Sequence, residues 1–350
     1  MKHFSCTISL LVLSSAASAQ SVDRATDNAA MRPTEHRAYA SGMYGNGRIS
    51  GIEQTGKKEM GWAFEVRFGT EIDLPGSRDG KLFSSDEKYR VDIIHYNEGH
   101  PDNNHRDGFA LQGIYNKPLS EKFSAELGFG PYYTMNTTSR RGVEYNWSNL
   151  GVLASAAILM DIDELVSGMH LRVGLNHVTM PGAHSSNALL VGVGKHFGAP
   201  ARSAQQFSDA DPLWLGATFM HGQTNHGGTQ TSAGFSLEAK KQYRQWATSV
   251  SVMAEGDDDT RVNRHGVALQ GWFVQPLTEK WTVSAGFGPY VAINTRGLNE
   301  YRVLALFSMQ LDRSIGKDWR VFANFNRVNT FRDKNDRDLL KVGFMRAFDL

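Results

Sequence analysis

Residues Gly108–Thr137 read GFALQGIYNKPLSEKFSAELGFGPYYTMNT, and residues Gly266–Thr295 read GVALQGWFVQPLTEKWTVSAGFGPYVAINT. The two stretches align without a gap and share 16 of their 30 residues. Each copy predicts a strand, a tight turn and a second strand. A repeat of this length indicates that one half-chain architecture occurs twice, and the rest of the sequence is interpreted on that basis.

The second strand of each copy alternates between two kinds of side chain. Apolar residues occupy every second position from Phe123 to Pro131, and small or polar residues occupy the positions between them. The same alternation runs from Trp281 to Pro289. Because successive side chains of a strand point to opposite faces, this pattern predicts a sheet that separates two unlike media.

The first 19 residues have the features of a secretory signal peptide. A short basic start at Lys2 precedes the apolar run Ile8–Leu13, and Ala17–Ala19 has the small-x-small pattern of a cleavage site. The one cysteine of the chain, Cys6, lies inside this segment. The mature chain is therefore expected to lack disulfides, thiol chemistry and cysteine-bound metals.

Composition narrows the class of protein further. The 37 basic and 36 acidic side chains nearly balance, which gives no electrostatic case for nucleic-acid binding. After the signal peptide there is no apolar run of about 18 residues, so helical membrane spans are not predicted. A secreted, glycine-rich chain with strand-like alternation is either a soluble β-protein or a transmembrane β-barrel.

The alternation divides the chain into two halves. Residues 20–37 predict a flexible lead-in, 38–198 a first barrel repeat, 199–211 a linker or periplasmic turn, and 212–350 a second barrel repeat. Each half holds eight candidate strands, most of them about 10 to 14 residues long, as tilted transmembrane strands require. Short turns alternate with longer polar loops, which is typical of outer-membrane barrels.

The two faces of the predicted strands differ in polarity. Apolar faces such as Leu171, Val173 and Leu175 suit lipid, whereas the opposite faces carry charges that would be costly in a hydrophobic core. We therefore expect the charged residues to line a polar lumen and to pair there. The predicted lumen-lining residues are Glu65, Arg67, Glu71, Arg90, Asp92, Glu126, Arg172, Glu238, Lys240, Arg320 and Lys341.

The predicted fold is an all-β transmembrane antiparallel barrel of about 16 strands, built from two 8-stranded repeats. The alternative is two tandem 8-stranded barrels, because duplication followed by fusion would give either result. We favour one barrel, since two would need two independent closures within one chain. About 16 strands would leave a water channel, whereas eight leave an interior just filled by side chains.

The run Asn176-His177-Val178-Thr179 in the first half resembles the lipid A 3-O-deacylase family of the outer membrane, and the resemblance covers about the last two strands of each half. That family consists of single 8-stranded barrels with a lipid-facing His-x-Ser-Asn motif and a glutamate on the next strand. The resemblance implies that His177 and Thr179 are candidate catalytic residues, with a histidine as base for a hydroxyl nucleophile. This sequence departs from the family, because threonine replaces serine and His184 or Ser185 stands where the glutamate is expected.

A simpler interpretation of His177 is an interfacial residue beside an outer loop, and the related run of the second half, Asn326–Asn329, has neither histidine nor hydroxyl. No metal site is predicted, because the loop histidines and the run Asp257–Asp259 match no standard ligand spacing. No nucleotide fingerprint is present either, so no cofactor is expected.

Three functions remain open at this point. The favoured one is a porin-like channel, with a polymer such as an exopolysaccharide as one candidate cargo, and this would not be an enzyme. The alternatives are a deacylase-like esterase, active or lapsed, and a structural barrel with a plugged lumen.

We expect the mature protein in the bacterial outer membrane after cleavage near Ala19. Its expected partners are outer-membrane lipid, the barrel assembly machinery that recognises a last strand ending near Phe348, and polysaccharide or envelope secretion components.

Overall fold

The structure is a computed structural model, and it describes residues 38–50, 59–72, 88–99, 104–140, 143–162, 164–197, 212–224, 230–243, 245–296, 299, 301–331 and 335–348. The predicted signal peptide, lead-in and linker lie outside these residues. The fold class is confirmed, because the described residues form sixteen antiparallel strands and no helix. None of them forms a helix long and apolar enough to cross a membrane.

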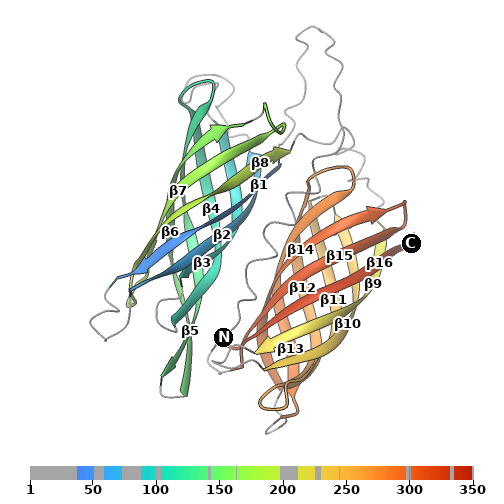
Figure 1. Cartoon of the computed structure of the whole chain (residues 1–350). Coiled ribbons are helices and arrows are strands. Elements are labelled where there is room, and N and C mark those ends of the chain that lie inside the picture. Colours follow the sequence, from blue (N-terminus) through green and yellow to red (C-terminus); the bar gives the residue numbers. More distant parts are fainter. Residues whose placement is uncertain are drawn as a thin grey trace.

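The first eight strands close into one barrel (Figure 1). Each strand pairs with the next, and β1 pairs with β8 from Ala38↔Phe197 to Ile49↔Ser186, which completes the ring. Its strands are β1 (Ala38–Ile49), β2 (Met60–Ile72), β3 (Lys88–Gly99), β4 (Asn104–Pro118), β5 (Phe123–Arg140), β6 (Val143–Asp161), β7 (Met169–Thr179) and β8 (Ser186–Phe197).

The last eight strands close into a second barrel in the same way. Here β9 pairs with β16 from Leu213↔Phe348 to Thr224↔Arg337. Its strands are β9 (Leu213–Thr224), β10 (Thr231–Tyr243), β11 (Trp246–Asp257), β12 (Asn263–Pro276), β13 (Trp281–Asn294), β14 (Tyr301–Ile315), β15 (Trp319–Asn329) and β16 (Arg337–Phe348).

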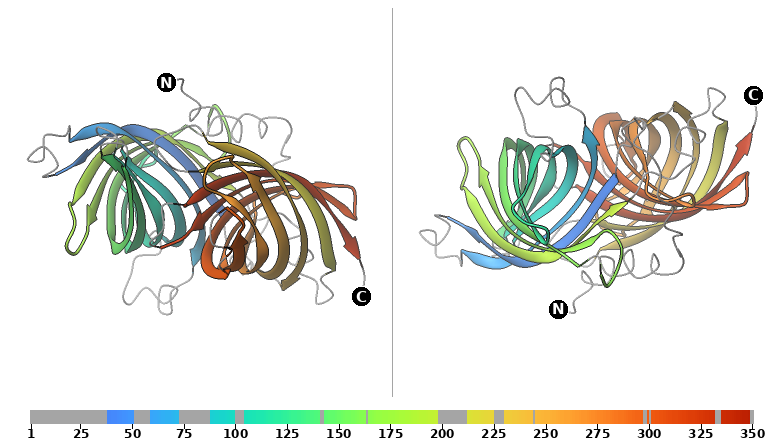
Figure 2. Two further views of the ribbon diagram at one scale, coloured as in Figure 1. Left: turned by 90° about the horizontal axis from the view of Figure 1, so that it is seen from below. Right: turned by 90° about the horizontal axis from the view of Figure 1, so that it is seen from above.

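The preference for a single 16-stranded barrel was therefore wrong, and the alternative of two tandem 8-stranded barrels is what the structure has. The physical reason is that β8 satisfies its second edge with β1 of its own half and leaves no edge open to β9. Closure removes the exposed edge of each sheet, so each half is complete by itself (Figure 2).

The repeat found in the sequence has the same role in both barrels. Gly130 and Gly288 lie at the closest approach of neighbouring strands, because a Cβ added to either would lie 1.9 Å from the carbonyl oxygen of Leu111 or Leu269. Any side chain at these positions would push the strands apart. The second glycine of each Gly-Phe-Gly run is therefore explained by strand spacing, whereas the first, Gly128 or Gly286, leaves room for interior side chains such as Ser155 or Trp272.

The two barrels lie side by side and contact each other along their outer walls (Figures 1 and 2). We call the end of each barrel that carries the turns 119–122 and 277–280 the short-turn end, and the opposite end the loop end. At the short-turn end Ala38 packs with Leu277 and Val283. Further along, the Phe109 and Phe307 rings stack with centroids 5.2 Å apart.

Close to the loop end the barrel–barrel contact becomes polar. The hydroxyl of Tyr133 donates to Asn329 Oδ1 at 3.4 Å, and Asn329 Nδ2 donates to Ser148 Oγ at 3.3 Å. We call this contact, from Ala38 at one end to Asn329 at the other, the junction. The outer wall of the second barrel is thus partly covered by the first, on the side formed by β13, β14 and β15.

Candidate functional site

Inside the first barrel, six of the predicted lumen residues form one chain of ion pairs. The four nitrogen–oxygen distances that precede Arg172 lie between 2.5 and 3.0 Å, and Arg172 itself pairs with Glu126. All six side chains are buried. In order of contact they are Glu65, Arg67, Asp92, Arg90, Glu126 and Arg172.

The remaining predicted lumen residues are placed differently. Glu71 lies near the short-turn end of the first barrel, with Oε1 3.8 Å from His196 Nδ1. In the second barrel Glu238, Lys240 and Lys341 are buried inside. Arg320 is only half-buried and lies over the Trp214 ring, 4.0 Å from its centroid.

The two buried lysines among these residues of the second barrel, Lys240 and Lys341, contact an aromatic ring and a sulfur atom. Lys240 Nζ lies 3.7 Å from the centroid of the Trp272 ring. Lys341 Nζ donates to Met253 Sδ at 2.9 Å. Cation–π and sulfur contacts of this kind satisfy an ammonium group without a carboxylate partner in direct contact. The two interiors therefore differ in chemistry, although the strand frameworks match.

Each interior also contains a cluster of buried apolar side chains. In the first barrel it includes Met43, Ile94 and Leu153, packed with Tyr96 and Tyr132. In the second barrel the cluster includes Met220, Met253, Tyr290, Leu304 and Leu306. An 8-stranded barrel is just wide enough for side chains to fill it, and these clusters and the ion pairs occupy that space. The wide lumen expected of a single 16-stranded barrel is not formed.

The candidate catalytic residues lie on the outer wall of the first barrel, close to its loop end. β7 alternates strictly between buried and exposed residues, and His177 and Thr179 continue the exposed row that begins with Leu171, Val173 and Leu175. This alternation follows from the pleat of the strand. Both polar side chains therefore share an otherwise apolar outer face.

His177 contacts a polar side chain on each of its two ring nitrogens. Its Nε2 lies 2.9 Å from Thr179 Oγ1, and its Nδ1 lies 2.8 Å from Asn187 Oδ1. Asn187 lies directly opposite His177 in the pairing of β7 with β8. Because an amide oxygen only accepts hydrogen bonds, the Nδ1 proton is fixed on the side of Asn187. Nε2 is then left to accept the hydroxyl proton of Thr179.

Asn187 was missed in the sequence, where His184 or Ser185 was assigned to the position of the family's glutamate. The structure places both of those residues in the connection that precedes β8. The signal that could have found Asn187 is the hairpin register, because His177 and Asn187 lie at equal distances from the middle of the connection. We call His177, Thr179 and Asn187 the outer-wall triad.

The same location in the second barrel is occupied by different residues. Arg327 lies opposite Asp338 in the pairing of β15 with β16, and its NH1 lies 2.9 Å from Asp338 Oδ1. Asn329 stands two residues after Arg327, as Thr179 does after His177. Arg327 and Asn329 are buried, because the junction covers them.

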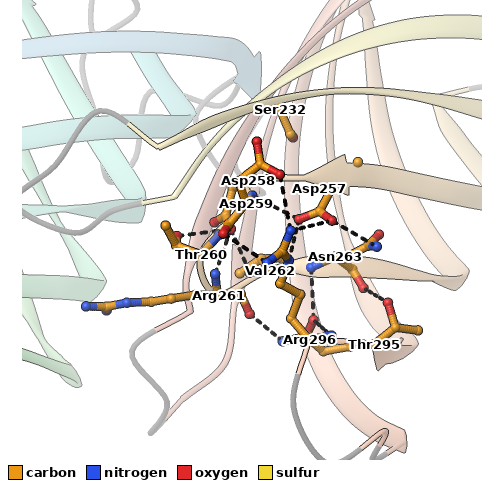
Figure 3. A network of polar contacts seen from close by, with 12 residues as sticks. Ser232, Asp257, Asp258, Asp259, Thr260, Arg261, Val262, Asn263, Thr295 and Arg296 are labelled. Carbon is orange, nitrogen blue, oxygen red and sulfur yellow. Dashed lines mark hydrogen bonds and ion pairs between the residues drawn. The ribbon is translucent and has the colours of Figure 1, made fainter.

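A network of polar contacts joins two connections at the loop end of the second barrel (Figure 3). Arg296 NH2 and Nε reach Asp257 at 2.8 and 2.6 Å. Burial raises the pKa of Asp258, but hydrogen bonds from the Thr224 hydroxyl and from the N–H groups of residues 260–262 outweigh it and hold that pKa well below its usual range.

The Asp257 and Asp258 carboxylates thus make hydrogen bonds and ion pairs within the protein. Among the described residues, no group of three or more His, Cys, Asp or Glu side chains is arranged to hold a metal ion.

A cavity of about 670 Å³ opens at the short-turn end of the first barrel, lined by residues that include Glu71, Arg90, His170 and His196. Arg90, an inner member of the ion-pair chain, is one of the residues that line this cavity.

Comparisons with known proteins add structures of the same general kind. No family model and no curated protein matches the chain. Among solved structures, the attachment invasion locus protein Ail of Yersinia pestis is 11% identical, with a TM-score of 0.34, and the match covers 47% of this chain and 100% of that one. Neisserial surface protein A is 13% identical over 46% of this chain and 97% of its own, with a TM-score of 0.32.

The toluene transporter TodX of Pseudomonas putida matches across both halves. It is 7% identical over 90% of each chain, with a TM-score of 0.24. Likenesses at this level of identity and TM-score carry no argument about what this chain does. The class of protein, two closed antiparallel 8-stranded barrels in one chain, rests on the strand pairing itself.

Proposed function

We propose that the chain is an outer-membrane protein whose first barrel hydrolyses an acyl ester of a lipid in the surrounding leaflet. The observation that carries this proposal is the outer-wall triad, in which His177 lies 2.9 Å from a hydroxyl and 2.8 Å from an orienting amide oxygen. The three side chains lie on the face that would contact lipid. Such a site would reach its substrate without the lipid leaving the membrane.

The outer walls support a membrane location. Monomeric soluble proteins rarely expose large contiguous apolar surfaces, whereas transmembrane barrels carry an apolar band around a polar interior. Here large apolar side chains are exposed on both barrels, and each interior contains buried charged side chains. The exposed residues include Leu127, Phe129, Val173, Leu175 and Leu189 on the first barrel and Phe219, Phe235, Val252, Val303 and Phe344 on the second.

The orientation follows from the two ends of the barrels. Outer-membrane barrels keep short turns in the periplasm and longer loops outside the cell. The outer-wall triad lies at the loop end, on either side of the connection between β7 and β8. It would therefore face the acyl chains and ester groups of the outer leaflet, where the resembling deacylase family finds lipid A.

The geometry supports nucleophilic acyl transfer. Thr179 Oγ1 would attack the ester carbonyl carbon while its proton passes to His177 Nε2. The ester C–O bond then breaks, and the released lipid alcohol takes that proton from His177. A water molecule next gives a proton to Nε2 and attacks the acyl-threonine, so that the fatty acid leaves and the proton returns to Thr179.

Asn187 has the role that a carboxylate has in a serine triad, with one difference. Its Oδ1 holds the Nδ1 proton and so selects the tautomer in which Nε2 is a base. It carries no net negative charge, however, and stabilises the imidazolium less than a carboxylate would. We therefore expect slower turnover than in an enzyme with a glutamate at this place, and we expect an Asn187→Asp variant to be active.

The test measures fatty-acid release by the refolded full chain in vesicles that contain lipid A or a glycerophospholipid. Thr179→Ala should abolish release and Thr179→Ser should retain it. Thr231→Ala is the matched control, because Thr231 is an exposed strand threonine at the loop end of the second barrel. Equal release by the wild type and by Thr179→Ala would overturn the proposal.

A structural role is the second candidate, and the filled interiors of the two barrels favour it. It predicts no ester hydrolysis and no conductance across a planar bilayer. A large steady conductance would instead return the channel hypothesis, including polymer export, to first place.

We also propose that the assembly machinery of the outer membrane recognises β16, which ends at Phe348.

A further inference from the structure

The connection that leads to Asn187 is held from inside the first barrel by a buried ion pair. Arg106 NH2 lies 2.9 Å from Glu98 Oε2, and the two side chains are 3% and 0% exposed. Glu98 comes from the end of β3 and Arg106 from the start of β4. Neither residue touches the outer-wall triad directly.

Both members of this pair hold the segment that leads into β8. Arg106 NH1 donates to the carbonyl oxygen of His184 at 2.7 Å. The hydroxyl of Ser186 donates to Glu98 Oε2. Two adjacent points of the chain, one in the connection and one in the strand, are thus bound to the same buried pair.

Ser186 and Asn187 are neighbours on a strand, so their side chains point to opposite faces. Ser186 is bound inside the barrel, and Asn187 contacts His177 outside it. A shift of the strand at Ser186 therefore moves Asn187 relative to His177. We propose that Arg106 and Glu98 are positioning residues of the esterase site, acting through Ser186 and Asn187; this inference rests on the proposed function.

The second barrel contains an equivalent buried ion pair but lacks the outer-wall triad. Arg264 Nε lies 2.6 Å from Glu255 Oε1, and Arg264 NH1 donates to the carbonyl oxygen of Asn335 at 3.3 Å, just before β16. A purely architectural role is therefore available to both pairs. Only the first pair stands behind a hydrogen-bonded histidine and hydroxyl, so only that pair should affect catalysis.

The experiment compares Arg106→Gln with Arg264→Gln in the full chain, using the same vesicle assay. Arg106→Gln should lower kcat on the order of 10- to 100-fold with little change in KM, because small misplacements of a catalytic group have effects of this size. Arg264→Gln should leave both constants within about 2-fold of wild type. The heat-dependent gel shift of a closed barrel serves as the folding control for each variant.

A double-mutant cycle separates positioning from general loosening. In an Asn187→Ala background, Arg106→Gln should have no further effect, since both changes disable the same orienting contact. Ser186→Ala, which removes only the hydroxyl, decides the question if Arg106→Gln does not fold. It should lower kcat in the presence of Asn187 and have no effect in its absence.

Three results would be distinguishable. If Thr179→Ala retains full activity, the proposed function itself fails. If Thr179→Ala is inactive but the Arg106 and Asn187 effects multiply, or Ser186→Ala matches wild type, the positioning role alone is overturned. If Arg264→Gln lowers kcat as much as Arg106→Gln does, the buried pairs are architectural and the inference also fails.

Discussion

The final two strands of each barrel have the same framework, but their outer ends are used differently. On the first barrel His177, opposite Asn187, contacts a hydroxyl on the exposed wall. On the second barrel the buried Arg327 forms an ion pair with Asp338, which lies opposite it, and Asn329 bonds to the neighbouring barrel. A location that is a candidate catalytic surface in one copy is therefore part of the junction in the other.

This difference shows what duplication allows. Two copies of one wall cannot both face lipid if one of them holds the barrels together. A covered histidine–threonine pair could not meet a lipid, whereas arginine and asparagine provide charge-assisted and amide hydrogen bonds suited to a buried contact. The carboxylate of Asp107 in the first barrel acts electrostatically on Arg327 across the junction, which adds to the ion pair within the second barrel.

The largest effect is expected when the residues of the second barrel are placed in the first. The triple variant His177→Arg, Thr179→Asn, Asn187→Asp should lose fatty-acid release by about 10⁴-fold or more, which corresponds to about 5.4 kcal/mol of transition-state stabilisation. The reason is that both the base and the nucleophile are gone. Release from lipid vesicles measures it, and activity within 10-fold of wild type would contradict the assignment.

The next largest effect is expected at the junction. Arg327→Ala leaves the buried Asp336 and the half-buried Asp338 without this cation, which should destabilise the protein by about 3–5 kcal/mol. His177→Ala at the equivalent exposed position should change stability by less than about 0.5 kcal/mol. Urea unfolding in vesicles, followed by tryptophan fluorescence, compares the two. Equal stability changes would mean that the two locations do not differ in burial as described.

A smaller effect is expected at Asn329. Asn329→Ala removes its bonds with Tyr133, Ser148 and Asp336, and should cost about 1–3 kcal/mol. Tyr133→Phe should matter much less once Asn329 is replaced, since its partner is already missing. Four unfolding curves complete this cycle, and independent effects would show that the hydroxyl does not hold the two barrels together.

The smallest effect is expected on the acid stability of the protein, through Asp258 at the loop end of the second barrel. The pKa of Asp258 is lowered from its ordinary value of 3.8, so the carboxylate contributes stability that is fully present above that value. This contribution is lost as pH falls below 3.8 toward the lower folded-state pKa. Melting temperatures measured from pH 6 to pH 2 should fall less steeply for Asp258→Asn than for wild type. Parallel curves would contradict the role of the Thr224 and backbone hydrogen bonds.

The fold was predictable in its local parts because they depend on local chemistry. Alternation along β5 predicted the strand and its two faces, and the repeat predicted the equivalent strand of the second barrel, β13. β5 and β6 are longer than the 10 to 14 residues expected of most strands: they have 18 and 19 residues, with β5 continuing to Arg140 and β6 beginning at Val143. The added end of β5, residues 137–140, is polar throughout and carries no period-two signal, so the sequence could not mark it. The start of β6 does alternate, with Val143, Tyr145 and Trp147 as its apolar positions, and that signal was missed.

The candidate site was predictable in part for the same reason. His177 and Thr179 lie two apart on one strand, so their shared face follows from the pleat alone. Asn187 depends on the register between two strands, and the buried pair Arg106–Glu98 depends on three strands that meet inside the barrel. The sequence by itself thus determined sixteen strands in two repeats, their inward and outward faces and the pair of residues on β7.

Tertiary structure alone decided the closure, the triad and the junction. An apolar-out, polar-in alternation is the same for one barrel of sixteen strands and for two of eight, so it cannot choose between them. The choice depends on whether β8 pairs with β1 or with β9, which is a contact between residues as far apart as Ala38 and Phe197. Because each set of eight strands closes on itself, both interiors are narrow enough for side chains to fill. The chain also has two separate outer walls, and the wall of the first barrel covers part of the wall of the second.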